Sequence, residues 1–434
     1  MSLATFHAVA AAVVLIAVLL FVVLRPRGLH VAWPAGVGAL AAIAIGLLSI
    51  PALLTIFGTT WDAAATLISL FLLSEALASN GFFVWAALHL ARSARGSGWR
   101  LYLLVLLLTT GVTALLANDG AVLMLTPIFA TLLLTIYPDE RSRLPYLFAA
   151  GFFADAMSAL FVPSNLTNII LADDNHLSFA HVAAWMAIPM ICAFAAGTLA
   201  FGLRFRKRLS KPYDTRVVGV PAEAIRDHTV FVAGWVVLCS LVAAYLVIGE
   251  LHLPFSLAAG AAALVMLALT HIRRLRSASE VLRAAPWNIL VYALGMFVVI
   301  TAAFDANILG FLTQPLRTHV TPSAAPLGAL FSGGLLALLA AAVNNLPAAL
   351  LGVLTLRAVA QPAHVAIYAI ILGVDIGPKL TPFGSLATLL WLGILDKNGI
   401  HISWGHYLRE NWWVAVVVLG VAFAGLLLSN LLLR

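Results

Sequence analysis

The sequence predicts an all-α protein that crosses a membrane many times, and three observations carry this prediction. Hydrophobic residues make up 63% of the 434-residue chain and charged residues only 9%, with a mean hydropathy of +1.06. Apolar runs long enough to cross a bilayer recur along the whole chain. Lys and Arg gather in the short segments between these runs. This chain has too little polar surface to cover a water-soluble globule, so we expect a polytopic membrane protein.

The expected spans follow from the apolar runs, which are bounded by charged or turn-forming segments. They lie at residues 3–24, 29–50, 62–91, 101–137, 144–172, 179–203, 229–249, 254–271, 286–304, 328–355, 364–395 and 411–432. The first run is too long for the apolar part of a signal peptide, so we interpret it as the first transmembrane helix.

Four of these runs contain polar or helix-breaking residues where a simple span would be apolar throughout. The interruptions are LANDG (116–120), VPSNLTN (162–168), VNNLP (343–347) and GPKLTPFGSLAT (377–388). Pro, Gly, Asn and Ser at these points remove helical hydrogen bonds or offer local ones, which frees backbone groups at membrane depth. Irregular backbone is tolerated there only where it lines an enclosed cavity, so the breaks predict a transport site made from broken helices.

The two halves of the chain correspond in the order of these features. Asn118 and Asn344 mark the first break of each half. Asp155 and Asp375 each stand nine residues before the core of the second break, which begins at Ser164 in one half and at Gly384 in the other. An internal repeat of about 226 residues is therefore predicted.

We expect the domains to be a first membrane repeat at 1–203, a basic linker at 204–228 and a second membrane repeat at 229–434. Each repeat is expected to hold about five transmembrane helices, a re-entrant hairpin (101–137 or 328–355) and a broken helix. An odd number of crossings would invert the second repeat. Paired full spans in place of the hairpins would give twelve spans and leave the flanking loops on the same sides.

The net charge of +7 would suggest nucleic-acid binding in a soluble protein. Here most of the 24 Lys and Arg residues fall in alternate loops and in the linker, which is the positive-inside pattern. The pattern excludes nucleic acid as a partner, places the linker in the cytoplasm and places both termini outside.

Six separate blocks of the chain resemble the ArsB arsenite/antimonite efflux permease family of the ion transporter superfamily. They are ANDGAVLMLTPI, AAGFFADAMSALFVPSNLTNII, VPAEAIRDH, LRAAPWNILVYALGMF, DIGPKLTPFGSLATLLW and HISWGHYLR, in this order. The resemblance implies a proton-coupled antiporter that expels trivalent arsenic and antimony hydroxides across the bacterial cytoplasmic membrane, alone or with a soluble ATPase. It also implies an elevator motion, in which a transport domain slides against a scaffold, and Asn- and Thr-containing hairpin tips at the substrate site.

Carboxylates inside the membrane are costly, which makes them candidates for proton coupling. Asp119, at the first tip, is the leading proton carrier; the alternative is that it only caps the following helix. Asp155 has no nearby base in the sequence and is the second candidate. Asp375 and Lys379 lie four residues apart and belong either to the coupling machinery or to a self-neutralising structural pair.

Neutral polar side chains cluster at all four breaks. Trivalent arsenic near neutral pH is an uncharged trihydroxide, which amides and hydroxyls suit better than a cationic clamp. Helix capping is the alternative role for any one of them. The expected substrate-binding residues are Asn118, Ser164, Asn165, Thr167, Asn168, Asn344, Asn345, Thr381, Ser385 and Thr388.

The sequence offers no thiolate or metal site. Cys192 and Cys239 are the only cysteines, and both fall inside predicted spans as structural core residues. Three thiolates around one arsenic are therefore impossible, and no cofactor is expected. Asp62 and Asp305 lie near span ends and are expected at the membrane interface.

Two other functions remain open on the sequence. A sodium- or proton-coupled symporter of small anions such as dicarboxylates or sulfate would share this architecture, but it would be expected to present a cationic clamp, and Lys379 is the only cation expected within the membrane. An intramembrane hydrolase would need a nucleophile with a base in reach, and no such motif occurs.

Overall fold

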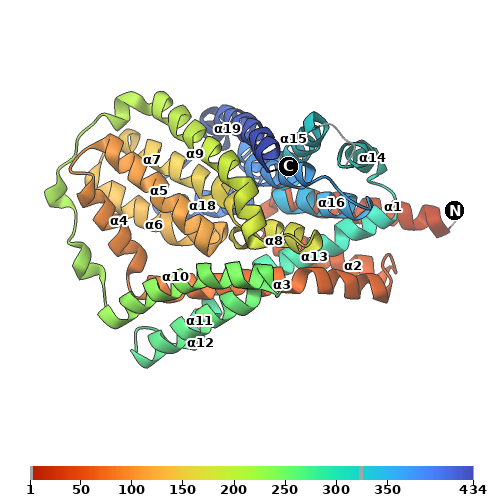
Figure 1. Cartoon of the computed structure of the whole chain (residues 1–434), viewed down its shortest axis with the longest axis horizontal. Helices are drawn as coiled ribbons and strands as arrows, with labels where there is room; N and C mark the ends of the chain where they lie inside the picture. Colours follow the sequence, from red (N-terminus) through yellow and green to blue (C-terminus); the bar gives the residue numbers. More distant parts are fainter. Residues whose placement is uncertain (1–2, 322–325, 434) are drawn as a thin grey trace.

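The computed structural model describes residues 3–321 and 326–433. Within these ranges the regular structure consists of α-helices and short 3-10 helices, with no strand (Figure 1). Ten of the helices in these ranges are long and apolar enough to cross a membrane. The predicted all-α polytopic fold is confirmed.

The first half contains nine α-helices in the described part of the chain. They are α1 (Leu3–Leu24), α2 (Ala32–Ala44), α3 (Ile50–Ser79), α4 (Phe82–Ser93), α5 (Gly98–Leu116), α6 (Asn118–Ile136), α7 (Glu140–Ala156), α8 (Leu166–Asp174) and α9 (Phe179–Leu209). Short 3-10 turns at Met157–Leu160 and Val162–Ser164 separate α7 from α8.

The second half follows a similar order. Its helices are α10 (His228–Glu250), α11 (Phe255–Ile272), α12 (Ala278–Ala284), α13 (Trp287–Asp305), α14 (Gly310–His319), α15 (Pro326–Val343), α16 (Asn345–Arg357), α17 (His364–Ile376), α18 (Leu386–Lys397) and α19 (Trp404–Leu432). A 3-10 turn at Gly377–Leu380 interrupts the path from α17 to α18. The breaks predicted at 162–168 and 377–388 are therefore present.

The break at LANDG turns α5 and α6 into a hairpin. Tyr146 Oη donates to Gly98 O at 3.2 Å and lies 3.2 Å from Tyr137 Oη, which donates to Lys211 O at 2.9 Å. The start of α5 and the end of α6 therefore lie together beside the linker. The break at VNNLP joins α15 to α16 in the same way, at Asn344. Whether either hairpin re-enters the membrane stays a prediction.

Both hairpin tips hold a strained residue. Ala117 has φ 66° and ψ 150°, and Asn344 has φ 96° and ψ 153°, in a region that glycine alone occupies readily. Such strain costs about 1–3 kcal/mol per residue and persists where the surroundings enforce it. In backbone conformation and N-cap position, Asn344 matches Ala117, the residue before Asn118. The internal repeat stays a prediction.

Helices of the two halves pack against each other. The most extensive contacts between the halves join α9 with α19, α3 with α11 and α2 with α13. Within the second half, α15 packs closely against α17. Small residues allow the closest approach: a Cβ added at Gly373 would lie 2.1 Å from Gly333 O, and one added at Gly333 would lie 2.3 Å from Ala369 O. This is the small-residue packing common between membrane helices.

The linker begins later than predicted, because α9 continues to Leu209. The connection from 210 to 227 contains only two short 3-10 turns and runs along the end of the molecule opposite the N-terminus (Figure 1). It is tied to the first half, since Tyr213 N donates to Gly96 O at 3.0 Å and Arg226 N donates to Asn80 O at 3.2 Å.

Candidate functional site

A small central pocket lies where the two hairpin tips, the two broken helices and α13 meet. Its volume is about 30 Å³, close to the volume of one water molecule in the liquid. It is lined by Asn118, Asp119, Asn165, Leu166, Thr167, Ile289, Tyr292, Ala293, Asn345, Leu346, Ser385, Leu386 and Ala387. Segments from all four predicted breaks therefore converge on one place.

The structure divides the predicted substrate residues into two groups. Asn118, Asn165, Thr167, Asn345 and Ser385 line the pocket. The other five lie behind its walls and hold the breaks in shape. The Ser164 hydroxyl lies between Phe161 O and Ser158 O, its two possible acceptors, and Asn168 Nδ2 donates to Ser158 O. Asn344 Nδ2 donates to Phe383 O, Thr381 Oγ1 donates to Ala341 O at 2.6 Å, and Thr388 Oγ1 accepts from Lys379 at 2.7 Å.

Asp119 presents its carboxylate to the pocket. It lies in the first turn of α6, and among the described residues its side chain makes no hydrogen bond or ion pair. The capping role is wrong for Asp119, because Ala117 occupies the N-cap position and Asn118 Oδ1 accepts from the backbone N of Asp119 at 2.9 Å. Because the Asn118 side chain accepts the hydrogen bond from this backbone N–H, the Asp119 carboxylate is not needed as a cap and faces the pocket.

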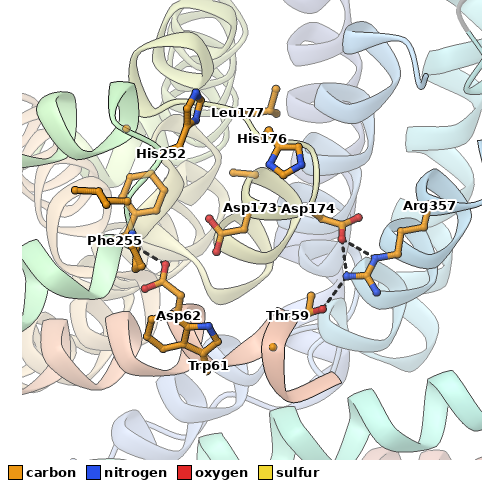
Figure 2. Close-up of a pocket in the computed structure, with 15 residues that line it drawn as sticks. Thr59, Trp61, Asp62, Asp173, Asp174, His176, Leu177, His252, Phe255 and Arg357 are labelled. Carbon is orange, nitrogen blue, oxygen red and sulfur yellow. Dashed lines mark hydrogen bonds and ion pairs between the residues drawn. The ribbon is translucent and has the colours of Figure 1, made fainter. Parts of the chain in front are cut away.

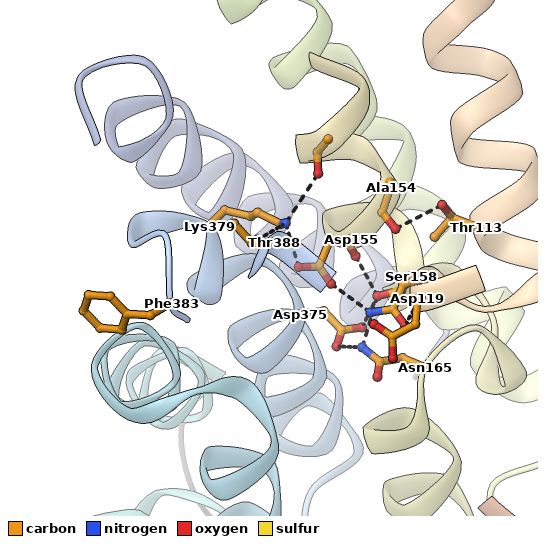
Figure 3. Close-up of polar contacts among 12 residues, drawn as sticks. Thr113, Asp119, Ala154, Asp155, Ser158, Asn165, Asp375, Lys379, Phe383 and Thr388 are labelled. Carbon is orange, nitrogen blue, oxygen red and sulfur yellow. Dashed lines mark hydrogen bonds and ion pairs between the residues drawn. The ribbon is translucent and has the colours of Figure 1, made fainter. Parts of the chain in front are cut away.

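Asp155 is engaged in a buried ion pair (Figure 3). Its Oδ2 lies 2.6 Å from Lys379 Nζ, and its Oδ1 accepts from Asn118 Nδ2 at 2.8 Å. Lys379 also donates to Thr388 Oγ1. No base lies near Asp155 in the sequence, and its partner comes from the other half of the chain.

Asp375 lies away from Lys379 and among neutral donors (Figure 3). Asn165 Nδ2 and Asn168 Nδ2 each donate to its carboxylate at 2.8 Å, and Ser158 Oγ donates at 3.1 Å. The self-neutralising pair with Lys379 is not formed. Asp155 and Asp375 therefore each bind residues of the opposite half. Asp155 pairs with Lys379 in the second break of the C-terminal half, and Asp375 accepts from Asn165 and Asn168 in the second break of the N-terminal half.

Sequence analysis missed two polar residues of this region. Tyr292 lines the pocket from α13, and its hydroxyl donates to Asn344 Oδ1 at 2.9 Å. Ser158 donates to Asp375 from the turn after α7. Ser158 lies between Asp155 and the predicted break, which was a usable signal, whereas Tyr292 stands in a plain apolar span.

A larger cavity of about 400 Å³ lies outside this centre, between α3, α8, α16 and the turn from α10 to α11 (Figure 2). Arg357, Asp174 and Asp62 are already engaged there. Arg357 contacts Asp174 and donates to Thr59 Oγ1 at 2.8 Å. Asp62 accepts from the backbone N of Phe255 at 3.0 Å and caps α11. Asp62 is buried and Asp305 is exposed at the end of α13. The interfacial position of both in the membrane stays a prediction.

The two cysteines are remote from the pocket lining. Cys192 is partly buried on α9, and Cys239 is exposed on α10, so the prediction that both are core residues is wrong for Cys239. The pocket lining has no Lys or Arg. Its polar groups are amides, hydroxyls and one carboxylate, a set suited to a small, neutral, hydrogen-bonding solute.

Comparison with known proteins agrees with this architecture. The family model described as arsenical pump membrane protein matches residues 9–429. An arsenical pump membrane protein of Yersinia enterocolitica is 37% identical over 414 residues, covering 94% of this chain and 96% of that protein. One of Escherichia coli is 37% identical over 423 residues, covering 96% and 98%, and one of Shigella flexneri is 36% identical with the same coverage. This chain therefore belongs to the arsenical pump membrane protein family.

Proposed function

We propose that this protein exports arsenite and antimonite as neutral trihydroxides across the bacterial cytoplasmic membrane, in exchange for protons. The observation that carries the proposal is the difference between the three aspartates in and around the central pocket. Asp155 is neutralised by Lys379, Asp375 accepts several neutral donors, and Asp119 alone opens onto the pocket.

The pocket chemistry supports exchange of this kind. Solute hydroxyls can donate to a deprotonated Asp119, whereas a protonated Asp119 loses acceptor capacity and competes as a donor. Proton uptake at Asp119 on the outside would therefore weaken solute binding and favour release. Loss of the proton to the cytoplasm would restore the acceptor, so that solute and proton occupy the site alternately.

The small-anion symporter is less well supported. An anion needs positive charge or convergent backbone donors, and Lys379 is held behind the pocket by Asp155 and Thr388. The carboxylate of Asp119 would repel an anion in the same space.

We also propose the arrangement in the membrane. Both termini face outside, the linker faces the cytoplasm, and the halves before and after it are inverted repeats that together form a scaffold and a sliding transport domain. The position of the linker at the end opposite the N-terminus supports this topology (Figure 1). Single cysteines introduced as Gly219→Cys and Thr5→Cys test this topology by thiol labelling from each side of the membrane. Labelling of both positions from the same side would contradict it.

The test of function is arsenite accumulation in vesicles reconstituted with the purified protein. A pH gradient, acidic on the side that accumulates arsenite, should drive uptake; a proton ionophore should abolish it, and exchange of sodium for potassium should leave it unchanged. Sodium-dependent uptake of a dicarboxylate or sulfate, without arsenite uptake, would support the symporter. Uptake that needs a soluble ATPase and ATP, and ignores the pH gradient, would show the membrane part of an ATP-driven pump.

A further inference from the structure

Tyr292 is the polar residue that α13 contributes to the central pocket. Ile289, Tyr292 and Ala293 line the pocket together, at positions that share one face of a helix. Tyr292 is 2% exposed. On the side of the pocket that α13 forms, the Tyr292 hydroxyl is therefore the one polar side-chain group, and apolar side chains lie on either side of it.

The hydroxyl of Tyr292 is fixed as a donor on one side. It donates to Asn344 Oδ1 at 2.9 Å, and the Nδ2 of the same amide donates to Phe383 O at 3.2 Å, which fixes the orientation of the amide. A phenol has a single hydrogen to give and can still accept. Toward the pocket, Tyr292 is consequently an acceptor.

Two other acceptors border the same small void. Ser385 Oγ is buried, at 1% exposure of its residue, and has no hydrogen-bond partner among the described residues. Asp119 presents its carboxylate without a partner in the same part of the chain. These three oxygen-bearing side chains come from α6, α13 and the turn before α18, and they surround a volume of about 30 Å³.

We propose that Tyr292 contacts the transported solute, and that Tyr292, Asp119 and Ser385 are three acceptors for the three hydroxyls of a pyramidal trihydroxide. This inference rests on the proposed function and adds a physical reason why the site would prefer a solute with three hydroxyls to one with fewer. The face of the solute without hydroxyls lies against apolar groups of Ile289, Leu346 and Leu386. A solute with fewer hydroxyls leaves one acceptor unpaired in a buried site, which lowers its binding.

The void must widen to admit the solute, since cavities that bind small organic molecules measure about 150 Å³. The bond from Tyr292 to Asn344 joins the α13 wall to the second tip. It keeps the phenolic oxygen at the edge of the site, where it can follow the tip as the pocket opens.

The experiment compares two solutes in reconstituted vesicles: arsenite, with three hydroxyls, and its monomethyl analogue, with two. Tyr292→Phe should lower kcat/KM for arsenite by about two- to tenfold, the worth of one neutral hydrogen bond. The analogue should lose less, because its methyl group can turn toward the new phenylalanine edge. Tyr245→Phe is the matched control, since the Tyr245 hydroxyl is buried without a partner in the described structure and lies outside the pocket lining.

Equal losses for both solutes would overturn the inference, because they would show that the hydroxyl acts only by holding Asn344. An unchanged kcat/KM for arsenite would overturn it as well. Ser385→Ala provides a second test that leaves Tyr292 in place and should show the same selective loss. Wild-type vesicles without proton-driven arsenite uptake would refute the proposed function itself, a result distinct from any pattern among the variants.

Discussion

Lys379 Nζ lies 2.6 Å from Asp155 Oδ2, and the two side chains, each 1% exposed, come from opposite halves of the chain. The closer aspartate in sequence, Asp375, is bound by amides and hydroxyls instead. A charge pair removed from water in this way is strongly destabilised when one partner is lost, because the other charge stays buried and unpaired.

Loss of either member of this pair should therefore unfold the centre of the protein more readily than loss of both. Asp155→Asn or Lys379→Met alone should lower the free energy of unfolding by about 3–5 kcal/mol. The double variant should recover most of that loss. Thermal unfolding in detergent measures it, and a double variant as unstable as the sum of the single variants would contradict the pairing.

Asp119→Asn should uncouple transport from protons. The amide has no titrating proton, so arsenite should still equilibrate across the vesicle membrane while a pH gradient no longer drives its accumulation. Asp305→Asn is the control, because Asp305 is exposed at the end of α13 and should leave accumulation intact. Normal proton-driven accumulation by Asp119→Asn would assign proton transfer to another group.

Ala117→Gly should raise the free energy of unfolding or leave it unchanged. Glycine removes strain of about 1–3 kcal/mol at φ 66°, against about 0.4–1 kcal/mol of added unfolded-chain entropy. Ala121→Gly, in the interior of α6, should instead destabilise by about 1 kcal/mol. Unfolding measurements should therefore show a loss of stability only for Ala121→Gly, and equal destabilisation by both variants would show that Ala117 is not strained.

Gly373→Ala should loosen the contact between α15 and α17. The added Cβ would lie 2.1 Å from Gly333 O, so the helices must separate, at about 1–3 kcal/mol or more. Gly334→Ala adds a Cβ with nothing within 4 Å and should be neutral or slightly stabilising. The thermal midpoint distinguishes them, and a tolerated Gly373→Ala would show that the two helices can separate freely.

Asp139 lies in the segment between α6 and α7, and its carboxylate pairs with Lys211 of the linker at 3.3 Å. This contact should be lost only in strong acid. The hydrogen bond from Ser142, helped by Lys211, lowers its pKa to about 2. Because this pKa is lower in the folded chain, the stabilising effect is complete above the ordinary carboxyl pKa of about 3.9. It disappears as the pH falls toward about 2. Pepsin cleavage of the linker, compared with Asp139→Asn, should be slower in the wild type near pH 4 and converge near pH 2. If the ratio of the two cleavage rates did not change between pH 4 and pH 2, Asp139 would not hold the linker through its charge.

The sequence predicted the fold and the breaks well, because both depend on local composition. Long apolar runs require membrane helices, and Pro163 and Pro378 stand where helices end in the structure. The pairing of charges was not predictable in this way. An i to i+4 spacing favours Asp375 with Lys379 on a continuous helix, but the 3-10 turn that begins at Gly377 carries Lys379 toward Asp155.

The same limit applies to Tyr292. Its neighbours in sequence are apolar, and its role depends on a tip more than 50 residues away along the chain. The partners of Asp62 were unpredictable for a related reason, since they are the first backbone N–H groups of α11, about 190 residues later. Local patterns show which residues are unusual for a membrane span, whereas the partner of each is fixed by tertiary packing.

The exchange of partners between the halves also bears on how the protein is made. Asp155 is synthesised roughly 220 residues before Lys379, a delay of about 10–45 s at typical translation rates. During that time the nascent first half holds a carboxylate without its cation, and its turn after α7 lacks the carboxylate of Asp375. A chain truncated before Lys379 would carry this defect permanently, as a buried charge without its partner at the centre of the molecule.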